Sequence, residues 1–354
     1  MSTQQDWILF LQSQNARFEN GRVVDFGSTS NIQQTDARTN FISDLSDLGL
    51  IQVNGSDARD FLQNQFCNDL REVDDQHSQI NAYCNPKGRV LAVMRILRKN
   101  DAYLLLLPNE LIETIVKRLK MFVLMSDVII SDISDSLIGV GILGVEIQNY
   151  FARSYFALPD IADGCLSEGE IITVKLPGIV PRFVVLAPLP TMKNIWQKMA
   201  SEYKPMPTDA WTFADIQSGI PQVFSATSAA FVPQMLNLHA IKGLSFSKGC
   251  YPGQEVVARM HYLGTLKRRM YLCHVEGQNC PLPGATLFAE NNTDDQGVGK
   301  IVHAAANPQG GCDFLAVMQI KAVESDQIYL DNTKKDKVIF KDLPYSVEVS
   351  RQSS

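Results

Sequence analysis

The residues best suited to chemistry lie in one stretch of ten, Lys248-Gly-Cys-Tyr-Pro-Gly-Gln-Glu-Val-Val257. A thiol reacts as the thiolate, and both a neighbouring cation and a helix N-terminus lower its pKa. Lys248 stands two residues before Cys250, and Pro252 suits the first position of a helix. The stretch therefore predicts a reactive Cys250 just ahead of a short helix, with Lys248 lowering the pKa of its thiol.

A purely structural reading of the same stretch stays open. Most cysteines in cytosolic proteins are small buried apolar groups, and Cys250 can be one of them. Gly249 and Gly253 permit tight turns or the close approach of another group. Tyr251 is expected to pack against the cysteine loop, and Tyr251 and Gly253 are also candidates for cofactor binding.

Three polar side chains follow on the predicted helix. Glu255 and Arg259 are four residues apart, the spacing of an ion pair on a helix surface. Gln254 is placed either to cap the helix or to contact a ligand. These residues are candidates for cofactor binding, with helix stabilisation as the alternative.

The stretch also resembles the signature of the YgfZ family, which comprises folate-binding proteins related to the glycine cleavage T-protein, an aminomethyltransferase. The pattern KGC-x-x-GQE carries most of the specificity, and further blocks follow the family's order. These blocks are Val53–Asp57, Phe61–Gln65, Asn68–Leu70, Tyr83–Arg89, Ile216–Pro221, Phe231–Gln234 and Ile241–Phe246. The resemblance covers about residues 43 to 350.

The expected fold is α+β, because strands and helices alternate in the first two thirds of the chain. Short strands with Gly-, Pro- and Asn-rich turns follow Gly264, a pattern typical of a small β-barrel. The resemblance implies a T-protein-like multi-domain architecture. It divides the chain into an N-terminal arm (1–42), a discontinuous folate-binding domain (43–125 plus 205–262), a second α+β domain (126–204) and a C-terminal β-barrel domain (263–350).

The resemblance implies non-covalent binding of tetrahydrofolate or another folate. Trp211 matches a family tryptophan associated with folate binding, although tryptophan is usually a core anchor. A second family tryptophan falls at Leu48, where this chain departs from the pattern. Gln217 stands where relatives with aminomethyltransferase activity carry a glutamate that grips the pterin. An amide still donates and accepts hydrogen bonds but loses the charge.

The aspartates that active aminomethyltransferases carry correspond to Leu91 and Ala92, which cannot polarise a folate nitrogen. The resemblance therefore favours a folate-binding accessory protein that supports iron–sulfur enzymes, including those that thiolate tRNA, with Cys250 as the working thiol. A folate-dependent aminomethyl or one-carbon transferase is the alternative. A cysteine hydrolase would need a histidine, His239 or His261, beside Cys250. A purely structural scaffold is the remaining possibility.

The composition narrows the class of protein. The 354 residues carry a formal net charge of −6, so strong nucleic-acid binding through bulk charge is not expected. Lys267-Arg-Arg269 is a local exception, and a solvated turn is its simpler explanation. No apolar run reaches the roughly 18 residues that span a bilayer, and no secretory signal is visible, so a cytoplasmic protein is expected.

Seven cysteines at irregular spacing, without a C-x-x-C pair, fit neither a disulfide framework nor a zinc or iron–sulfur ligand set. Five scattered histidines form no H-x-x-x-H pair. The sequence therefore predicts no bound metal.

Overall fold

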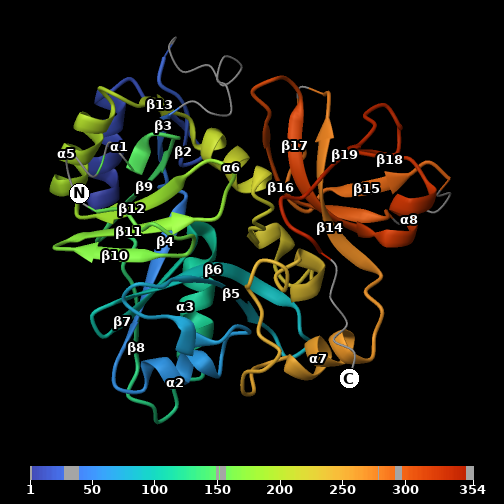
Figure 1. Ribbon diagram of the computed structural model, residues 1–354, viewed down its shortest axis with the longest axis horizontal. Coiled ribbons are helices and arrows are strands. Elements are labelled where there is room, and N and C mark those ends of the chain that lie inside the picture. The colour runs from blue at the N-terminus through green and yellow to red at the C-terminus, as the bar shows by residue number, and fades with distance from the viewer. Residues whose placement is uncertain are drawn as a thin grey trace.

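The computed structural model describes residues 2–27, 40–148, 151, 157–277, 279–291 and 297–347. The fold is mixed α+β, as expected. Two large sheets lie together at one end of the molecule, and a third sheet lies beside them (Figure 1). Within the described residues no helix is long and apolar enough to cross a membrane.

The first sheet is antiparallel and has the strand order β5-β6-β7-β4-β8. Helices α2 and α3 cover one of its faces; on α3, Ile112, Ile115 and Leu119 repeat at helical spacing and are buried. The elements of this region are β4 (Leu48–Asn54), α2 (Ala58–Gln63), η2 (Leu70–Glu72), β5 (Gln79–Cys84), β6 (Val90–Lys99), β7 (Ala102–Pro108), η3 (Asn109–Leu111), α3 (Ile112–Lys120) and β8 (Ile129–Asp132).

The second sheet has the strand order β10-β11-β12-β9-β3-β13. All its pairs are antiparallel except that of β13 with β3, which joins residues 204–206 to residues 41–43 in parallel. Its elements are β3 (Phe41–Asp44), β9 (Ile138–Leu143), β10 (Cys165–Glu168), β11 (Ile171–Leu176), β12 (Arg182–Ala187), α5 (Leu189–Met199) and β13 (Lys204–Met206).

The four leucines 104–107 on β7 show how the two sheets stack. Leu105 and Leu107 point into the core under α2 and α3, whereas Leu104 and Leu106 belong to the core shared with the second sheet. Side chains alternate between the two faces of a strand, so a strand buried on both faces is apolar throughout. The region is therefore layered as helices, sheet, sheet, helices.

The described part of the expected N-terminal arm is packed into this layering rather than extended. Helix α1 (Thr3–Ser13) lies against α5, and Trp7 is completely buried with its ring edge-on to Trp196 at 5.6 Å. The indole nitrogen of Trp7 donates a hydrogen bond of 2.7 Å to Asp44. Strands β1 (Arg17–Glu19) and β2 (Arg22–Asp25) form a hairpin. Residues 28–39 of the expected arm lie outside the described residues.

The third sheet, drawn in orange and red in Figure 1, is a curled half-barrel of order β18-β15-β16-β17-β14-β19. The small β-barrel expected here takes the form of this curled half-barrel, whose edge strands β18 and β19 have only two and three residues. Its elements are β14 (Arg268–Val275), β15 (Thr286–Ala289), β16 (Gly299–Ala306), β17 (Cys312–Gln319), α8 (Ile320–Ser325), β18 (Ile328–Tyr329) and β19 (Ile339–Lys341). Before it come α6 (Thr208–Gln217), η4 (Ser225–Thr227), η5 (Pro233–Leu236) and α7 (Gln254–Tyr262).

Candidate functional site

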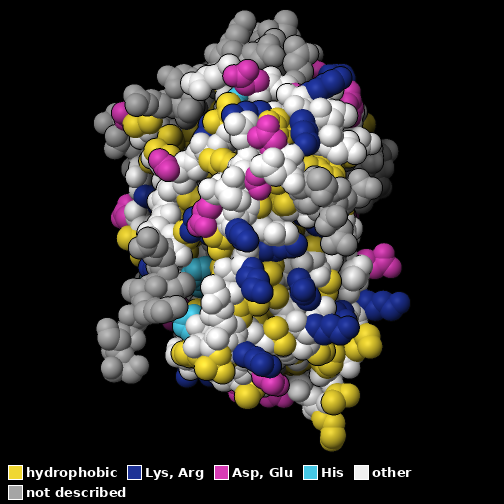
Figure 2. Space-filling view, turned by 90° about the vertical axis from the view of Figure 1, so that its right-hand side faces the viewer, with side chains coloured by type: hydrophobic (Ala, Val, Ile, Leu, Met, Phe, Trp, Pro, Cys, Tyr) yellow, Lys and Arg dark blue, Asp and Glu magenta, His cyan; other side chains and the backbone are white. Residues whose placement is uncertain are grey.

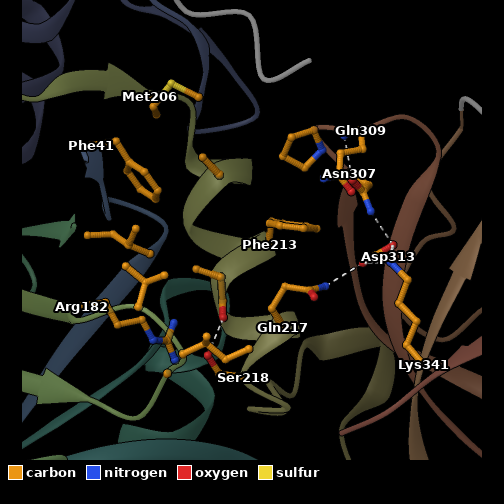
Figure 3. Close-up of a pocket in the computed structure, with 17 residues that line it drawn as sticks. Phe41, Arg182, Met206, Phe213, Gln217, Ser218, Asn307, Gln309, Asp313 and Lys341 are labelled. Carbon is orange, nitrogen blue, oxygen red and sulfur yellow. Dashed lines mark hydrogen bonds and ion pairs between the residues drawn. The ribbon is translucent and has the colours of Figure 1, made fainter. Parts of the chain in front are cut away.

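A cavity of about 250 Å³ lies where helix α6 meets the half-barrel (Figure 3). Phe41 and Met206 lie on one side, and Asp313 and Lys341 lie on the opposite side. Phe213 and Gln217 of α6 also line it. An apolar wall with a few convergent polar groups is the usual composition of a small-molecule site.

The polar side of this cavity is organised around Asp313, which is completely buried. Its oxygens lie 2.8 Å from Lys341 Nζ and 3.0 Å from Asn307 Nδ2. His274 Nδ1 lies 2.6 Å from the same carboxyl group. Burial by itself raises the pKa of a carboxyl, but these hydrogen bonds outweigh it and hold the pKa of Asp313 below its usual value. The group is therefore a carboxylate at neutral pH.

This carboxylate fixes the orientation of Gln217. The amide nitrogen of Gln217 lies 2.6 Å from Oδ2 of Asp313. A carboxylate only accepts hydrogen bonds, so the NH₂ end of the amide must face it. Oε1 of Gln217 has no hydrogen-bond partner in the described part of the chain and remains available as an acceptor at the cavity wall.

Arg182 lines the same cavity and is almost completely buried. Its Nη1 lies 2.6 Å from Asp215, and its Nε donates to the carbonyl of Pro177 at 2.8 Å. Its Nη2 is buried and has no hydrogen-bond partner among the described residues. An unsatisfied buried donor is costly, so this position favours a ligand that supplies an acceptor.

A smaller cavity of about 70 Å³ shares Arg182 with the first and brings Leu48 and Trp211 together. The guanidinium of Arg182 lies 5.4 Å from the Trp211 ring centroid. Most of Trp211 is used in core packing, since only 4% of its surface is accessible. A Cβ at Gly141 would stand 2.4 Å from the indole, so only glycine fits beneath it. Trp211 is thus both a core anchor and a wall of the smaller cavity.

The signature loop packs against the turn at residues 85–88. Gly253 has φ +85°, and a Cβ there would stand 2.5 Å from both the Asn85 carbonyl oxygen and the Gly88 nitrogen. The predicted helix exists, but it begins at Gln254 rather than at Pro252. The left-handed conformation of Gly253 ends the loop and delays the first helical turn, because only glycine adopts it without strain.

Lys248 does not have the role predicted for it. Its ammonium is buried and donates to the carbonyls of Gln63, Phe66 and Asn68 at 2.5, 2.5 and 3.2 Å. It also lies 5.3 Å from the Tyr251 ring centroid. Burial lowers the pKa of Lys248 to about 8. The lysine therefore fastens the signature loop to the end of α2 instead of facing the thiol of Cys250.

Cys250 is exposed, and its thiol has no hydrogen-bond partner among the described residues. Neither candidate histidine bonds to it in the described contacts. His261 instead stacks on Phe246, with ring centroids 3.7 Å apart. None of the described cavities has Cys250 in its lining.

The remaining residues predicted for cofactor binding lie around this loop and not at the two cavities beside α6. Tyr251 is buried, and burial raises the pKa of its phenol. Gln254 contacts the Lys248 carbonyl at 3.4 Å. Glu255 and Arg259 are exposed on α7 and form no ion pair in the described residues.

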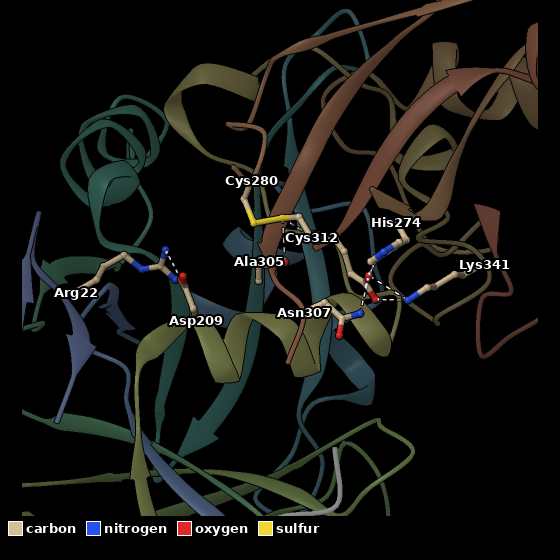
Figure 4. Close-up of a disulfide and its surroundings, with 9 residues drawn as sticks. Arg22, Asp209, His274, Cys280, Ala305, Asn307, Cys312 and Lys341 are labelled. Carbon is tan, nitrogen blue, oxygen red and sulfur yellow. Dashed lines mark hydrogen bonds and ion pairs between the residues drawn. A yellow bond between two sulfur atoms is a disulfide. The ribbon is translucent and has the colours of Figure 1, made fainter. Parts of the chain in front are cut away.

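A disulfide joins Cys280 to Cys312 (Figure 4), which corrects the expectation that the cysteines form no bridge. Cys312 immediately precedes Asp313, so the bridge anchors the start of β17 beside the buried carboxylate. The two cysteines are 32 residues apart, and neither belongs to a recognisable spacing motif. Among the described residues no group of three His, Cys, Asp or Glu side chains is arranged to hold a metal ion.

Comparison with known proteins shows which family the chain belongs to. The chain is 35% identical over 234 residues to the tRNA-modifying protein YgfZ of Colwellia psychrerythraea strain 34H, covering 65% of this chain and 70% of that protein. The chain belongs to the YgfZ family. No family model matches it.

The chain also shares its fold with a solved aminomethyltransferase. The glycine cleavage system aminomethyltransferase T from Bartonella henselae superposes with a TM-score of 0.76, covering 94% of this chain and 95% of that one. At 11% identity this likeness establishes the fold alone. The expected T-protein-like architecture is thereby confirmed.

Proposed function

We propose that the protein is a cytoplasmic, folate-binding accessory protein that supports iron–sulfur enzymes, including enzymes that modify tRNA. Membership of the YgfZ family and the T-protein-like fold support this proposal. The observation that carries the folate part is the oriented amide of Gln217 at the wall of a cavity that also holds an unsatisfied arginine donor. We propose further that the discontinuous domain 43–125 plus 205–262 contributes Phe213 and Gln217 to the site, and that Phe41, Arg182 and Lys341 from other parts of the chain complete it.

The residues lining the larger cavity suit a folate. Gln217 offers a hydrogen-bond acceptor to the N–H groups of a pterin, and Arg182 offers a donor to its ring acceptors. Phe41 and Phe213 would flank the flat ring, and the ammonium of Lys341, which also lines the cavity, would attract an anionic tail. When bound, tetrahydrofolate supplies a carrier for one-carbon units.

Cys250 is the proposed working residue of the signature loop. An exposed thiol is accessible to a client protein, for thiol–disulfide exchange or for contact with a damaged cluster. Lys248 supports this role indirectly. Its buried ammonium donates hydrogen bonds to the carbonyls of Gln63 and Phe66 and so anchors the loop that carries Cys250. Glu255 and Arg259 on the adjoining helix form no ion pair with any described residue and are available for client contacts.

The alternative of an aminomethyl or one-carbon transferase gains no support from the site. Ala92 is completely buried in the core beneath α2 and α3, and Leu91 is half-buried. Neither supplies the carboxylate that the chemistry needs. A cysteine hydrolase would need a histidine beside Cys250. Among the described residues His261 stacks on Phe246, and no hydrogen bond joins His239 to the thiol.

Two measurements test the two halves of the proposal. Calorimetric titration with tetrahydrofolate should give saturable binding with the unmodified protein and weaker binding with Gln217→Leu. The absence of binding heat with the unmodified protein would remove the folate half. In cells lacking the protein, Cys250→Ala should fail to restore iron–sulfur enzyme activity while Cys67→Ala, at a buried thiol, restores it. Full rescue by Cys250→Ala would remove the thiol half.

A further inference from the structure

A basic groove of about 350 Å³ lies between the half-barrel and the segment that precedes the signature loop. Four of its lining side chains are cationic, namely Arg89, Lys267, Arg268 and Lys300, and none is acidic. The rest of the lining is apolar. This concentration of positive charge is unexpected in a chain whose net charge is −6.

The register of the half-barrel explains why the cations converge. Lys300 on β16 pairs with Val317 on β17, and Val317 pairs with Met270 on β14. Paired residues share a face of the sheet, and so do residues two apart on one strand. Arg268 therefore lies on the same face as Lys300, on the other side of Val317.

No carboxylate of the described residues forms an ion pair with the cations of the groove. Lys267, Arg268 and Lys300 form no ion pair within the described ranges of the chain. Arg89 is fixed by a hydrogen bond of 2.9 Å from its Nη1 to the carbonyl of Ala230. Figure 2 shows Lys and Arg side chains gathered across the middle of the face that carries the half-barrel, with most of the acidic side chains above them.

The groove is connected to the signature loop. A Cβ added at Gly88, the residue before Arg89, would stand 3.1 to 3.3 Å from atoms of Val256 and Gly253, so this turn packs closely against the start of α7. Tyr262 at the end of α7 is 67% exposed and stands five residues before Lys267. Exposed aromatic and cationic side chains close together in the sequence, as Tyr262, Lys267 and Arg268 are here, can bind single-stranded nucleic acid, with phosphates on the cations and a base on the ring.

We propose that this groove binds the phosphodiester backbone of single-stranded RNA. Arg89, Lys267, Arg268 and Lys300 contact successive phosphates, and the Tyr262 ring stacks on an unpaired base. The affinity is modest because the net charge of the chain is negative. It depends strongly on salt because each contact between a cation and a phosphate releases counterions from the RNA. The inference goes beyond folate binding and does not depend on it.

Fluorescence anisotropy with a labelled single-stranded RNA of about 12 nucleotides tests the proposal. If all four cations contact phosphates, the affinity of the unmodified protein should fall about 50-fold between about 50 and 200 mM salt. The double variant Lys267→Glu/Arg268→Glu should bind at least about tenfold more weakly, and its affinity should fall only about sevenfold over the same salt range. Lys300→Glu, on a separate strand, should weaken binding in the same direction.

The matched control is Lys117→Glu/Lys120→Glu, which makes the same charge change at two exposed positions of α3. Binding that survives in this control and is lost in the groove variants supports the proposal. Equal loss in both double variants would mean that only overall charge matters and would overturn it. Failure of the unmodified protein to bind RNA at about 50 mM salt would overturn it as well. Tetrahydrofolate titration of the groove variant should be unchanged, which separates this inference from the folate proposal.

Discussion

The amide nitrogen of Gln217 lies 2.6 Å from Asp313, and this contact joins the end of helix α6 to the half-barrel. The two residues are 96 positions apart in the chain. The contact determines which end of the amide is available to a ligand, because Asp313 can only accept hydrogen bonds.

Asp313→Asn should weaken tetrahydrofolate binding about five- to tenfold, since an amide at 313 no longer forces the Gln217 oxygen toward the ligand and about one hydrogen bond is lost. Calorimetry measures the change. If Asp313 acts through Gln217, the double variant with Gln217→Leu should bind no more weakly than Gln217→Leu alone. Additive losses in the double variant would contradict this positioning role.

Gly253→Ala should destabilise the fold by roughly 1–3 kcal/mol or more, because the residue has positive φ and its Cβ would meet backbone atoms at 2.5 Å. Gly249→Ala, in the same loop, is the matched control, since its Cβ would meet no atom within 4 Å. Urea unfolding compares the two variants. Equal stability of both would show that the loop does not need its contact with residues 85–88.

The buried ammonium of Lys248 predicts a pH dependence of stability. Its pKa is lowered in the folded protein from 10.5 to about 8, so the unfolded chain binds more protons between these values. Stability should therefore rise with pH across that window, by about 1–3 kcal/mol for this group. Below about pH 8 the cost of burying the charge is fully present.

Lys248→Arg tests this dependence, since a guanidinium stays charged across the window. The difference in free energy of unfolding, unmodified protein minus Lys248→Arg, should increase from pH 8 to pH 10.5. A difference that stays constant with pH would contradict the assignment.

Reduction of the Cys280–Cys312 disulfide should lower the free energy of unfolding by about 2–4 kcal/mol, because the bridge closes a loop of 32 residues in the unfolded chain. Urea unfolding with and without a reductant measures this. Cys280→Ala should lose a similar amount and should not respond to the reductant. The prediction would be refuted if the free energy of unfolding of the unmodified protein were the same with and without the reductant.

Local sequence was sufficient for features that depend on neighbours in the chain. The apolar residues Ile112, Ile115 and Leu119 recur at helical spacing, and α3 carries them on its buried face. A helix after Cys250 was also predicted correctly, although its start was placed two residues early. The error arose because φ at Gly253 is set by the turn at residues 85–88, which lies more than 160 positions away in the chain.

Sequence by itself determined the α+β class, the family and the residues of the signature, since periodicity and motif order are written along the chain. Only the tertiary structure decided what those residues touch. It turned Lys248 inward to three carbonyls, joined Cys280 to Cys312, and set Gln217 against Asp313. Each of these contacts joins segments at least 32 residues apart. Burial and pairing at such separations follow from how the sheets and helices stack. Local sequence patterns do not encode that stacking.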